Sequence, residues 1–298
     1  MCPKNLSGHG ANVRDLLIAS KKRDPYSDKY SNGKVVVIGG SESFHGAPVL
    51  ASKAANNTLA ALRVGAGYAI TCVPKSIEIA VRKVSPELVV KALDGKNLDL
   101  NGVKVLAGIA KKADAIVIGP GTGREKGTLH AMAKFIDWAC VNGKRIIIDA
   151  DALYSIRYAK RLNKNVLITP NGFEFQIFHG RRLDQKDLAS RIKAAMEVAK
   201  RLDANVLLKG HETIVTDGVR YKIIRSRSSA LATMGTGDVL AGMVGGFAAR
   251  NEDMLIAAVA GAYLQARIGD SLYKKKGNHI IATDVVDAIP GIFKSNHA

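Results

Sequence analysis

A short run of small residues beside one carboxylate is the segment of this 298-residue chain best suited to chemistry. It is Gly235-Thr236-Gly237-Asp238, and it leads directly into an apolar stretch of helical character. Small residues at the start of a helix leave backbone N–H groups without intrahelical partners, and together with the helix dipole these groups form an anion site. The segment therefore predicts a binding site for a phosphate group with a carboxylate next to it.

Asp238, in the first turn of the predicted helix, has two interpretations. As a general base it takes the proton from a substrate hydroxyl while the neighbouring amides hold the transferring phosphoryl group. Phosphoryl transfer needs mainly positioning and charge neutralisation, which this arrangement supplies when Mg²⁺ is added. In the structural alternative, Asp238 only complements the helix dipole, which contributes ~0.3–1 kcal/mol. The segment is not a Walker A loop, because the chain has no G-x-x-x-x-G-K-[ST] motif.

A sheet must position these residues, and the chain alternates short apolar runs with helical patterns. The runs that predict buried strands are 34–38, 68–73, 115–118, 145–148, 166–168 and 206–208. Strand–helix alternation over this length predicts an α/β fold with a central, mostly parallel sheet and helices on both faces. We expect one domain over residues 1–298, with residues 1–30 as a lead-in segment.

The pattern changes near residue 212. The segments 212–216 and 220–224 flank Asp217-Gly218, which predicts a late β-hairpin. Two long apolar helices, at about 236–249 and 254–273, are then expected to close the chain.

Distinctive residues follow several of the predicted strands. In parallel α/β sheets, ligands bind at the carboxyl ends of the strands. Glycine lets a ligand approach the backbone closely, although turns between strands and helices also use glycine for structural reasons. The turns concerned are Gly39-Gly40-Ser41, Gly119-Pro120-Gly121-Thr122-Gly123, Asp149-Ala150-Asp151, Thr169-Pro170-Asn171 and Lys209-Gly210.

Composition limits the class of protein. The net charge is +18, but the basic residues are spread along the chain, aromatic residues make up only 5%, and no nucleic-acid motif accompanies them. We therefore expect a solvated basic surface that attracts anionic nucleotides, and no nucleic-acid partner.

No apolar run approaches the ~18–20 residues that cross a bilayer, so we expect no membrane association and a cytoplasmic location. Cys2, Cys72 and Cys140 form no C-x-x-C pair and are expected to be ordinary thiols.

The motifs, taken in order, resemble those of the NAD(P)H-hydrate dehydratases, a family of the ribokinase-like superfamily. The Gly-Thr-Gly-Asp segment resembles the anion hole and catalytic Asp of that superfamily. The resemblance extends from about residue 25 to residue 290. The other matching segments are Gly39-Gly40-Ser41, Gly46-Ala47-Pro48, Gly65-Ala66-Gly67, 119–123, 149–153 and 208–210.

The resemblance implies a ribokinase-like fold and an unusual lyase activity. Members of the family phosphorylate the C6 hydroxyl of hydrated NADH or NADPH, using ADP or, in eukaryotic members, ATP. Phosphate then leaves and the normal cofactor is regenerated. The resemblance therefore implies ADP (or ATP) and Mg²⁺ as cofactors, hydrated NADH or NADPH as the substrate, and a homo-oligomer, for instance a tetramer.

The resemblance also implies roles for individual residues. Asp238 would be the base beside the C6 hydroxyl, and Glu174 would contact Mg²⁺ through water. Asp149 would act in orienting or indirectly in metal binding. For Asp151, a functional role and a structural role at a helix start are both open. Residues implied in nucleotide and phosphate binding are Lys209, Gly210, His211, Glu212, Thr213, Gly235, Thr236 and Gly237. Residues implied in contact with the hydrated dinucleotide are Ala47, Gly121, Gly123, Asn171 and Asp238.

The chain departs from the family pattern around the predicted substrate site. Asn171 stands where the family has His, Met234 where it has Gly, Gln265 where it has His, and Ser228-Ser229-Ala230 where it has Asn-Pro-Gly. These changes leave open a small-molecule kinase of the same superfamily, acting on a hydroxymethylpyrimidine, a thiazole or a sugar alcohol. A non-catalytic nucleotide-binding or RNA-binding protein is favoured only by the net charge.

Overall fold

A computed structural model of the protein describes residues 7–20, 24–42, 61, 64–84, 88–251 and 253–295. The strands are β1 (Ser7–Gly10), β2 (Lys34–Ile38), β3 (Tyr68–Pro74), β4 (Val89–Leu93), β5 (Ala115–Ile118), β6 (Arg145–Ile148), β7 (Val166–Ile168), β8 (Asn205–Leu208), β9 (Glu212–Thr216) and β10 (Tyr221–Arg225). The helices are α1 (Val13–Ala19), η1 (Lys75–Ile77), α4 (Glu78–Arg82), α5 (Leu100–Ala110), α6 (Lys126–Val141), η2 (Ala150–Tyr158), α7 (Gln176–His179), α8 (Leu188–Leu202), α9 (Thr236–Ala248), α10 (Met254–Lys276) and α11 (Ala282–Ser295).

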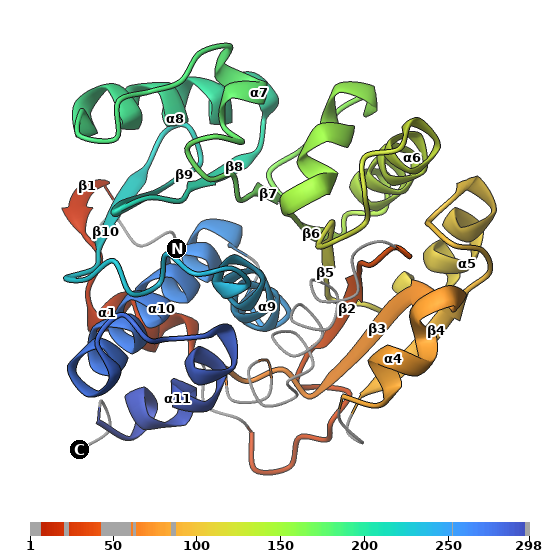
Figure 1. Ribbon diagram of the computed structural model, residues 1–298, viewed down its shortest axis with the longest axis horizontal. Helices are drawn as coiled ribbons and strands as arrows, with labels where there is room; N and C mark the ends of the chain where they lie inside the picture. The colour runs from red at the N-terminus through yellow and green to blue at the C-terminus, as the bar shows by residue number, and fades with distance from the viewer. Residues whose placement is uncertain are drawn as a thin grey trace.

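The strands form one sheet in the order β1-β10-β9-β8-β7-β6-β5-β2-β3-β4. Neighbouring strands are parallel except where β9 pairs with β8 and with β10. The strands follow an arc, with α9, α10 and α11 on its inner side and α5, α6 and α8 on its outer side (Figure 1). The predicted α/β fold, with a mostly parallel sheet and helices on both faces, is confirmed.

Alternate side chains of each strand enter two different cores, because successive residues of a strand point to opposite faces. In β2, Val35 and Val37 pack in the core that contains α9 and α10, whereas Val36 and Ile38 pack in the core that contains α5 and α6. All four side chains are at most 1% exposed. A strand buried on both faces must be apolar at nearly every position, which is why these runs predicted strands correctly.

The lead-in segment contains a strand and a helix that belong to the domain. Strand β1 pairs in parallel with β10 at one edge of the sheet, and α1 packs on α10. A capping box closes the start of α1, since Asn12 N donates to Asp15 Oδ2 at 2.8 Å and the Asn12 side chain accepts in return. These elements span four and seven residues, so their patterns are too short to predict from periodicity.

The predicted late hairpin is confirmed. Strands β9 and β10 pair antiparallel, with Thr216 opposite Tyr221. In the turn, Asp217 Oδ1 accepts hydrogen bonds from the amides of Val219 and Arg220, and Gly218 has φ +89°. That left-handed conformation favours glycine, as the Asp-Gly signal requires.

The prediction that two helices close the chain is wrong, because α11 follows α10. Helix α11 contains Pro290, a residue that normally interrupts helices, yet Val285, Val286 and Ile289 are buried in the α9–α10 core. Packing therefore outweighs local propensity here. Helix α10 ends at Gly277 with three lysines in its last turn, which complement the helix dipole. In the part of the chain described, no helix combines the length and apolarity needed to cross a bilayer.

The side chain of Asn251 joins the lead-in segment to the end of α9, and its removal should be costly. Asn251 is 4% exposed, and its Nδ2 donates to the carbonyls of Ala19 at 3.0 Å and Phe247 at 2.8 Å. We expect Asn251→Ala to lower the free energy of unfolding by about 1–3 kcal/mol, because buried carbonyls lose their donor. Urea denaturation measures this change.

Asn142 provides the matched control, because its Nδ2 also donates to the carbonyl four residues earlier, that of Trp138, at 2.8 Å, but at an exposed position. We expect Asn142→Ala to cost less than about 0.5 kcal/mol. Equal shifts for the two variants would show that burial of Asn251 contributes nothing.

Candidate functional site

Helix α9 begins with amides that are free to bind a ligand. Gly235, the residue before the helix, has φ +89° and no side chain caps the helix start. Within the described residues, the amides of Gly237 and Asp238 have no hydrogen-bond acceptor. The first turn of α9 therefore presents unpartnered donors at the positive end of the helix dipole, as the sequence predicts.

A cavity of about 560 Å³ opens beside this turn. We call it the α9 cavity. Of the predicted binding residues, those that line it are Asn171, Lys209, Gly210, His211, Thr213, Thr236 and Gly237. Gly235 and Asp238 flank Thr236 and Gly237 in the chain but do not line the cavity. Glu212 does not line it either, and its carboxylate lies 3.3 Å from Arg225 Nε. The structure thus brings most of the residues predicted to bind nucleotide to one hollow.

An ion pair and a hydrogen bond join the ends of three adjacent strands under the cavity. Asp149, at the end of β6, is 2% exposed and lies 2.9 Å from Nζ of Lys209, at the end of β8. The hydroxyl of Thr169, at the end of β7, donates to Asp149 at 2.7 Å. A buried carboxylate with a charged partner and a second donor is well compensated, so Asp149 holds the ammonium group in place.

Lys209 remains a cation in this position. Burial opposes its charge, but the carboxylates of Asp149, Glu174 and Asp238 outweigh burial and raise the pKa of Lys209 above its ordinary value. A Cβ atom on Gly237 would lie only 3.3 Å from Nζ of Lys209. The ammonium group therefore lies against the first turn of α9, where it adds a full positive charge to the anion site.

The carboxyl group of Asp238 is partly buried. Burial raises its pKa first, the charge of Asp149 raises it further, Lys209 lowers it, and Glu174 and Asp151 add smaller repulsions. The result is a pKa of about 7. A carboxyl group that titrates near the working pH suits a general base, and one that only complements a helix dipole has no need of such a shift.

Asn171 and Glu174 form a reciprocal cap on the turn that follows β7. Asn171 Oδ1 accepts from the amides of Phe173 and Glu174, both at 2.9 Å, and Glu174 Oε2 accepts from Asn171 N at 2.8 Å. This pattern is a capping box and has a structural purpose. Glu174 is nevertheless close enough to act on the pKa values of Lys209 and Asp238, so its charge belongs to the site.

The carboxylate of Asp151 binds the glycine turn after β5 and not a ligand. Its carboxylate accepts from Gly123 N at 3.0 Å and from Arg124 Nε at 2.7 Å. Gly121 and Gly123 both have positive φ, a conformation that favours glycine. Asp151 therefore holds this turn, whereas the sequence placed its structural role at a helix start. Gly121 and Gly123 lie outside the lining of the α9 cavity, and Ala47 lies outside the described residues.

Three polar side chains near the site received no role of their own from the sequence. Ser41 Oγ is buried without a hydrogen-bond partner among the described residues, close to Gly123. Gln265, noted in the sequence only as a departure, donates from Nε2 to the carbonyl of Thr236 at 2.6 Å and lines the α9 cavity. The guanidinium of Arg191 is fully buried against Gly210 and donates to the carbonyl of Glu212 at 2.9 Å. No signal identified Arg191, because Arg in an amphipathic helix ordinarily faces solvent.

The described residues do not favour a metal site built from protein side chains alone, nor a reactive cysteine. Among residues whose placement is described, no group of three or more His, Cys, Asp or Glu could hold a metal ion by itself. Burial raises the pKa of the Cys72 thiol to about 12 and that of Cys140 to about 11. Both are therefore unreactive thiols, as predicted.

Comparison with known proteins finds relatives over nearly the whole chain. The sequence profile of a family described as NAD(P)H-hydrate dehydratase matches residues 35–291. The ADP-dependent (S)-NAD(P)H-hydrate dehydratase of Nitrosopumilus maritimus is 35% identical over 275 residues, which cover 91% of this chain and 92% of the relative. Other curated relatives are longer, and the chain spans about half their length, 54% and 53% in two cases.

Solved structures show the same fold. A ribokinase-like superfamily protein from Enterococcus faecalis superposes with a TM-score of 0.82 at 23% identity, covering 99% of this chain and 98% of the other. The ADP/ATP-dependent NAD(P)H-hydrate dehydratase of Bacillus subtilis, co-crystallised with ATP/Mg²⁺, superposes with a TM-score of 0.80 at 25% identity, covering 98% and 99%. The predicted ribokinase-like fold is confirmed.

The raised pKa of Asp238 predicts how its replacement changes stability with pH. The pKa rises from 3.8 to about 7 in the folded protein. Between these values the folded state keeps a proton that the unfolded chain has lost, so the stability contribution of Asp238 falls as pH rises. We expect Asp238→Asn to match the wild type near pH 4 and to be more stable by about 1–3 kcal/mol at pH 8, after allowance for partial exposure. Thermal unfolding at a series of pH values measures this.

A control of opposite sign comes from Asp187, the exposed N-cap of α8. Hydrogen bonds from the side chain and amide of Ser190 hold its pKa below the ordinary value. Asp187→Asn should therefore lose stability relative to the wild type as pH rises. The same pH trend in both variants would contradict the burial of Asp238.

Proposed function

The chain belongs to the NAD(P)H-hydrate dehydratase family, and we propose that it repairs hydrated NADH and NADPH by ADP-dependent dehydration. The substrate would be the (S)-hydrate, the isomer in the name of the Nitrosopumilus relative. The products are NAD(P)H, AMP and phosphate. The observation that carries the proposal is a carboxyl group with a pKa of about 7 next to unpartnered amides at the start of α9.

In this reaction Asp238 takes the proton of the C6 hydroxyl. The hydroxyl oxygen forms a bond to the terminal phosphorus of ADP as the bond between that phosphorus and AMP breaks. Hydroxide is a poor leaving group and phosphate a good one. The ring nitrogen then expels phosphate from C6, and loss of the neighbouring ring proton restores the double bond. A kinase fold can in this way perform a net elimination of water.

The residues that line the α9 cavity support the binding of nucleotide there. Gly235, Thr236 and Gly237 would hold the transferring phosphoryl group with backbone amides, which are best placed where negative charge develops. The amide of Thr236 would first have to leave the carbonyl of Thr233, to which it donates at 3.4 Å. Lys209 would neutralise part of that charge. The loop Gly210, His211, Glu212 and Thr213 would contact the nucleotide, although the carboxylate of Glu212 is engaged with Arg225.

The hydrated dinucleotide would lie toward the turns after β2, β5 and β7. Gly121 and Gly123 leave room at the backbone, and the unpartnered hydroxyl of Ser41 lies beside Gly123. Asn171 would contribute its side-chain nitrogen Nδ2, since its Oδ1 already accepts hydrogen bonds from the turn that it caps. The assignments of these residues and of Ala47 rest on the family resemblance and are part of the proposal.

The acidic residues of the site fit a magnesium ion bound mainly through nucleotide phosphates. Mg²⁺ keeps several waters and takes one or two carboxylates together with substrate phosphates. Glu174 uses one carboxylate oxygen for its capping bond, so the other is available for a water-mediated contact. When bound there, Mg²⁺ would supply charge neutralisation for the phosphates.

Two further predictions concern the cellular location of the protein and its number of subunits. The cytoplasmic location and the homo-oligomer, for instance a tetramer, remain proposals. Exposed apolar side chains on one helix support the second: on α1, Val13, Leu17 and Ile18 are 37–43% exposed. Light scattering of the purified protein measures the number of subunits.

Replacement of Asp238 tests its role as the base. With hydrated NADH, ADP and Mg²⁺, we expect the wild type to restore reduced-nicotinamide absorbance, and Asp238→Asn to do so at least about 100-fold more slowly. The wild-type rate should fall about tenfold per pH unit below pH 7, because the base must be ionised. No recovery by the wild type with either ADP or ATP would remove the proposal, and a stable phosphorylated hydroxymethylpyrimidine or thiazole would favour the kinase alternative.

A methyl group on Gly237 tests the phosphate site. The added Cβ would approach Nζ of Lys209 to 3.3 Å and occupy space proposed for the phosphoryl group. We expect Gly237→Ala to raise the KM for ADP at least about tenfold, the effect of losing a charge-assisted contact. Gly127→Ala in α6 is the control, because a Cβ there meets nothing within 4 Å, and its KM should not change. A Gly237 variant with unaltered KM would place the phosphates elsewhere.

A further inference from the structure

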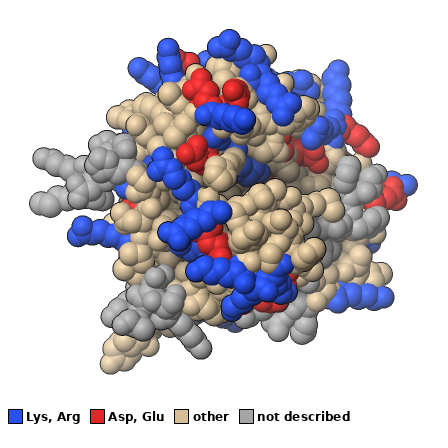
Figure 2. All heavy atoms as spheres, turned by 60° about the vertical axis from the view of Figure 1, so that its left-hand side comes forward, with Lys and Arg blue, Asp and Glu red and all other residues tan. Residues whose placement is uncertain are grey.

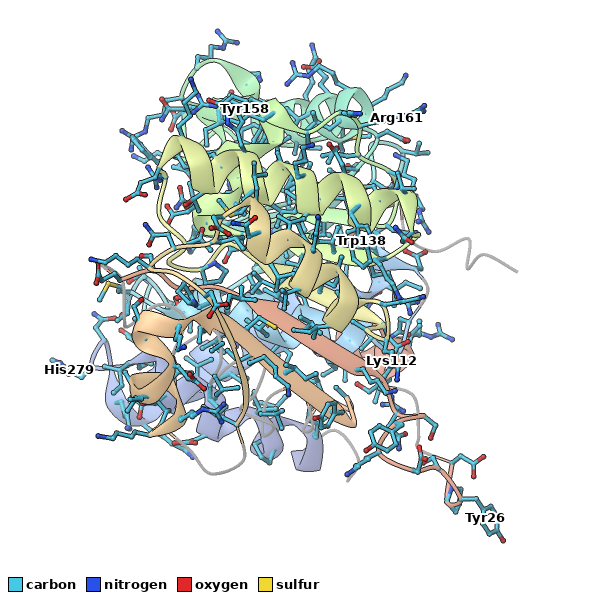
Figure 3. All side chains as sticks on the ribbon, turned by 90° about the vertical axis from the view of Figure 1, so that its right-hand side faces the viewer. Tyr26, Lys112, Trp138, Tyr158, Arg161 and His279 are labelled. Atoms are coloured by element: carbon cyan, nitrogen blue, oxygen red, sulfur yellow. The ribbon has the colours of Figure 1, made fainter. Side chains whose placement is uncertain are left out.

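A second cavity, of about 630 Å³, lies at the opposite end of the strands from the candidate site. We call it the lysine cavity, and its walls include Tyr30, Lys34, Tyr68, Ile70, Lys91 and Lys112. Lys34 and Tyr68 are the first residues of β2 and β3, whereas the candidate site follows the last residues of strands. Figure 3 shows this side of the molecule, with Lys112 beside the start of β2.

Three lysines give the cavity a positive charge. Lys34, Lys91 and Lys112 come from three separate segments, and the residues found to line the cavity include no carboxylate. Within the described residues, none of the three has an ion-pair partner. Unpaired lysines that converge on a hollow attract anions, above all phosphates, which accept hydrogen bonds from ammonium groups.

Neighbouring negative groups do not cancel this charge. Asp114 Oδ2 accepts from the backbone amide of Lys34 at 2.8 Å, and Asp28 Oδ1 accepts from the amides of Tyr30 and Ser31 at 2.9 and 2.7 Å. Both carboxylates keep their negative charge, and Asp28 interacts with Lys34, but neither lines the cavity. The C-terminal end of α5, at Ala110, contributes about half a negative charge. Together these groups offset only part of the three positive charges on the cavity wall.

The wall of the cavity also offers an aromatic surface. Tyr30 and Tyr68 meet edge to face with ring centroids 6.0 Å apart, and the ammonium of Lys34 lies 4.8 Å from the centre of the Tyr30 ring. Tyr30 is 51% exposed, so part of its ring is open to a ligand. Packing of a planar base on a tyrosine ring is a recurrent contact in proteins that bind nucleotides.

The floor of the cavity is a part of the sheet that α5 covers incompletely, since Gly108 and Ile109 of that helix form part of the wall. Ile70, Val36 and Ile116 form one row across β3, β2 and β5, so their side chains share a face. Ile116 and Val36 are at most 1% exposed, but Ile70 is only partly buried. An apolar floor under three lysines and two tyrosines is typical of small-molecule sites, whose volumes are ~300–1,000 Å³.

We infer that the lysine cavity binds a nucleotide-sized phosphorylated ligand, with its phosphates on Lys34, Lys91 and Lys112 and its base against Tyr30. This site is separate from the one proposed for catalysis and does not depend on that proposal. The ligand class is the nucleoside diphosphates and related nucleotides, because three lysines can bind more than one phosphate group.

The number of ADP molecules bound per chain tests the inference. Isothermal titration of the full-length protein in its native assembly should give two sites per chain, at α9 and in the lysine cavity. The double substitution Lys91→Glu and Lys112→Glu reverses two exposed charges and should weaken the second site at least about tenfold. The control Lys134→Glu and Lys193→Glu reverses two exposed charges on α6 and α8, outside both cavities, and should retain two sites.

ADP binding that is unchanged in number and affinity in the Lys91–Lys112 variant overturns the inference, whether the wild type binds one ADP per chain or two. The hydrated-NADH assay, run on the same variant, should show unchanged activity, because neither lysine lies near α9. If the wild type fails in that assay while the second site persists, only the proposed catalytic function is lost.

The aromatic contact is tested with a second pair of variants. Tyr30→Ala should weaken ADP several-fold at this site and leave inorganic pyrophosphate, which has no ring, unchanged. Tyr26→Ala is the control, since Tyr26 is 97% exposed and projects from the same segment (Figure 3). An unchanged ADP affinity in Tyr30→Ala contradicts the base contact. RNA that binds about 100-fold more tightly than ADP and is lost in the Lys91–Lys112 variant would overturn the small-molecule assignment.

Discussion

The ion pair between Asp149 and Lys209 is the interaction on which the candidate site depends. It joins β6 to β8 across the end of β7, and Thr169 adds a hydrogen bond from β7 itself. Burying two charges is costly unless each is compensated by good geometry, so the pair holds three strand ends in one arrangement. That arrangement places the Lys209 ammonium group against Gly237 at the start of α9. An anion bound by the α9 amides therefore meets a cation that is already oriented.

The site is locally acidic inside a strongly basic protein. The net charge is +18, and Lys and Arg side chains cover much of the surface in Figure 2. Around Lys209, in contrast, the carboxylates of Asp149, Glu174 and Asp238 all act on its pKa. The two distributions serve different purposes. The surface charge attracts anionic nucleotides from a distance, whereas burial, reinforced by neighbouring carboxylates, raises the pKa of Asp238 to about 7.

The regular part of the fold was predictable because each buried strand must be apolar on both faces. Strands β2, β5, β6 and β7 were located within a residue of their ends on this basis. The elements that sequence reasoning missed depend on contacts elsewhere in the chain. Strand β1 exists through its pairing with β10, and α11 keeps Pro290 in a helix because its apolar face packs on α10. Local patterns cannot show such pairings, since the stabilising partner lies more than a hundred residues away or on another helix.

The types of residue at the strand ends and at the start of α9 can be read from the amino-acid chain alone, because turns that bind phosphate need glycine and a positive helix terminus regardless of the remaining structure. The chain alone does not show which of these residues bind ligand and which hold the turn. Asp151 and Asn171 use their side chains on backbone amides, Arg191 is buried behind Gly210, and Asp238 acquires its pKa of about 7 from burial and from Asp149, 89 residues earlier in the chain. Only the tertiary structure decides these outcomes, because burial and the distance between charges are properties of the packed molecule.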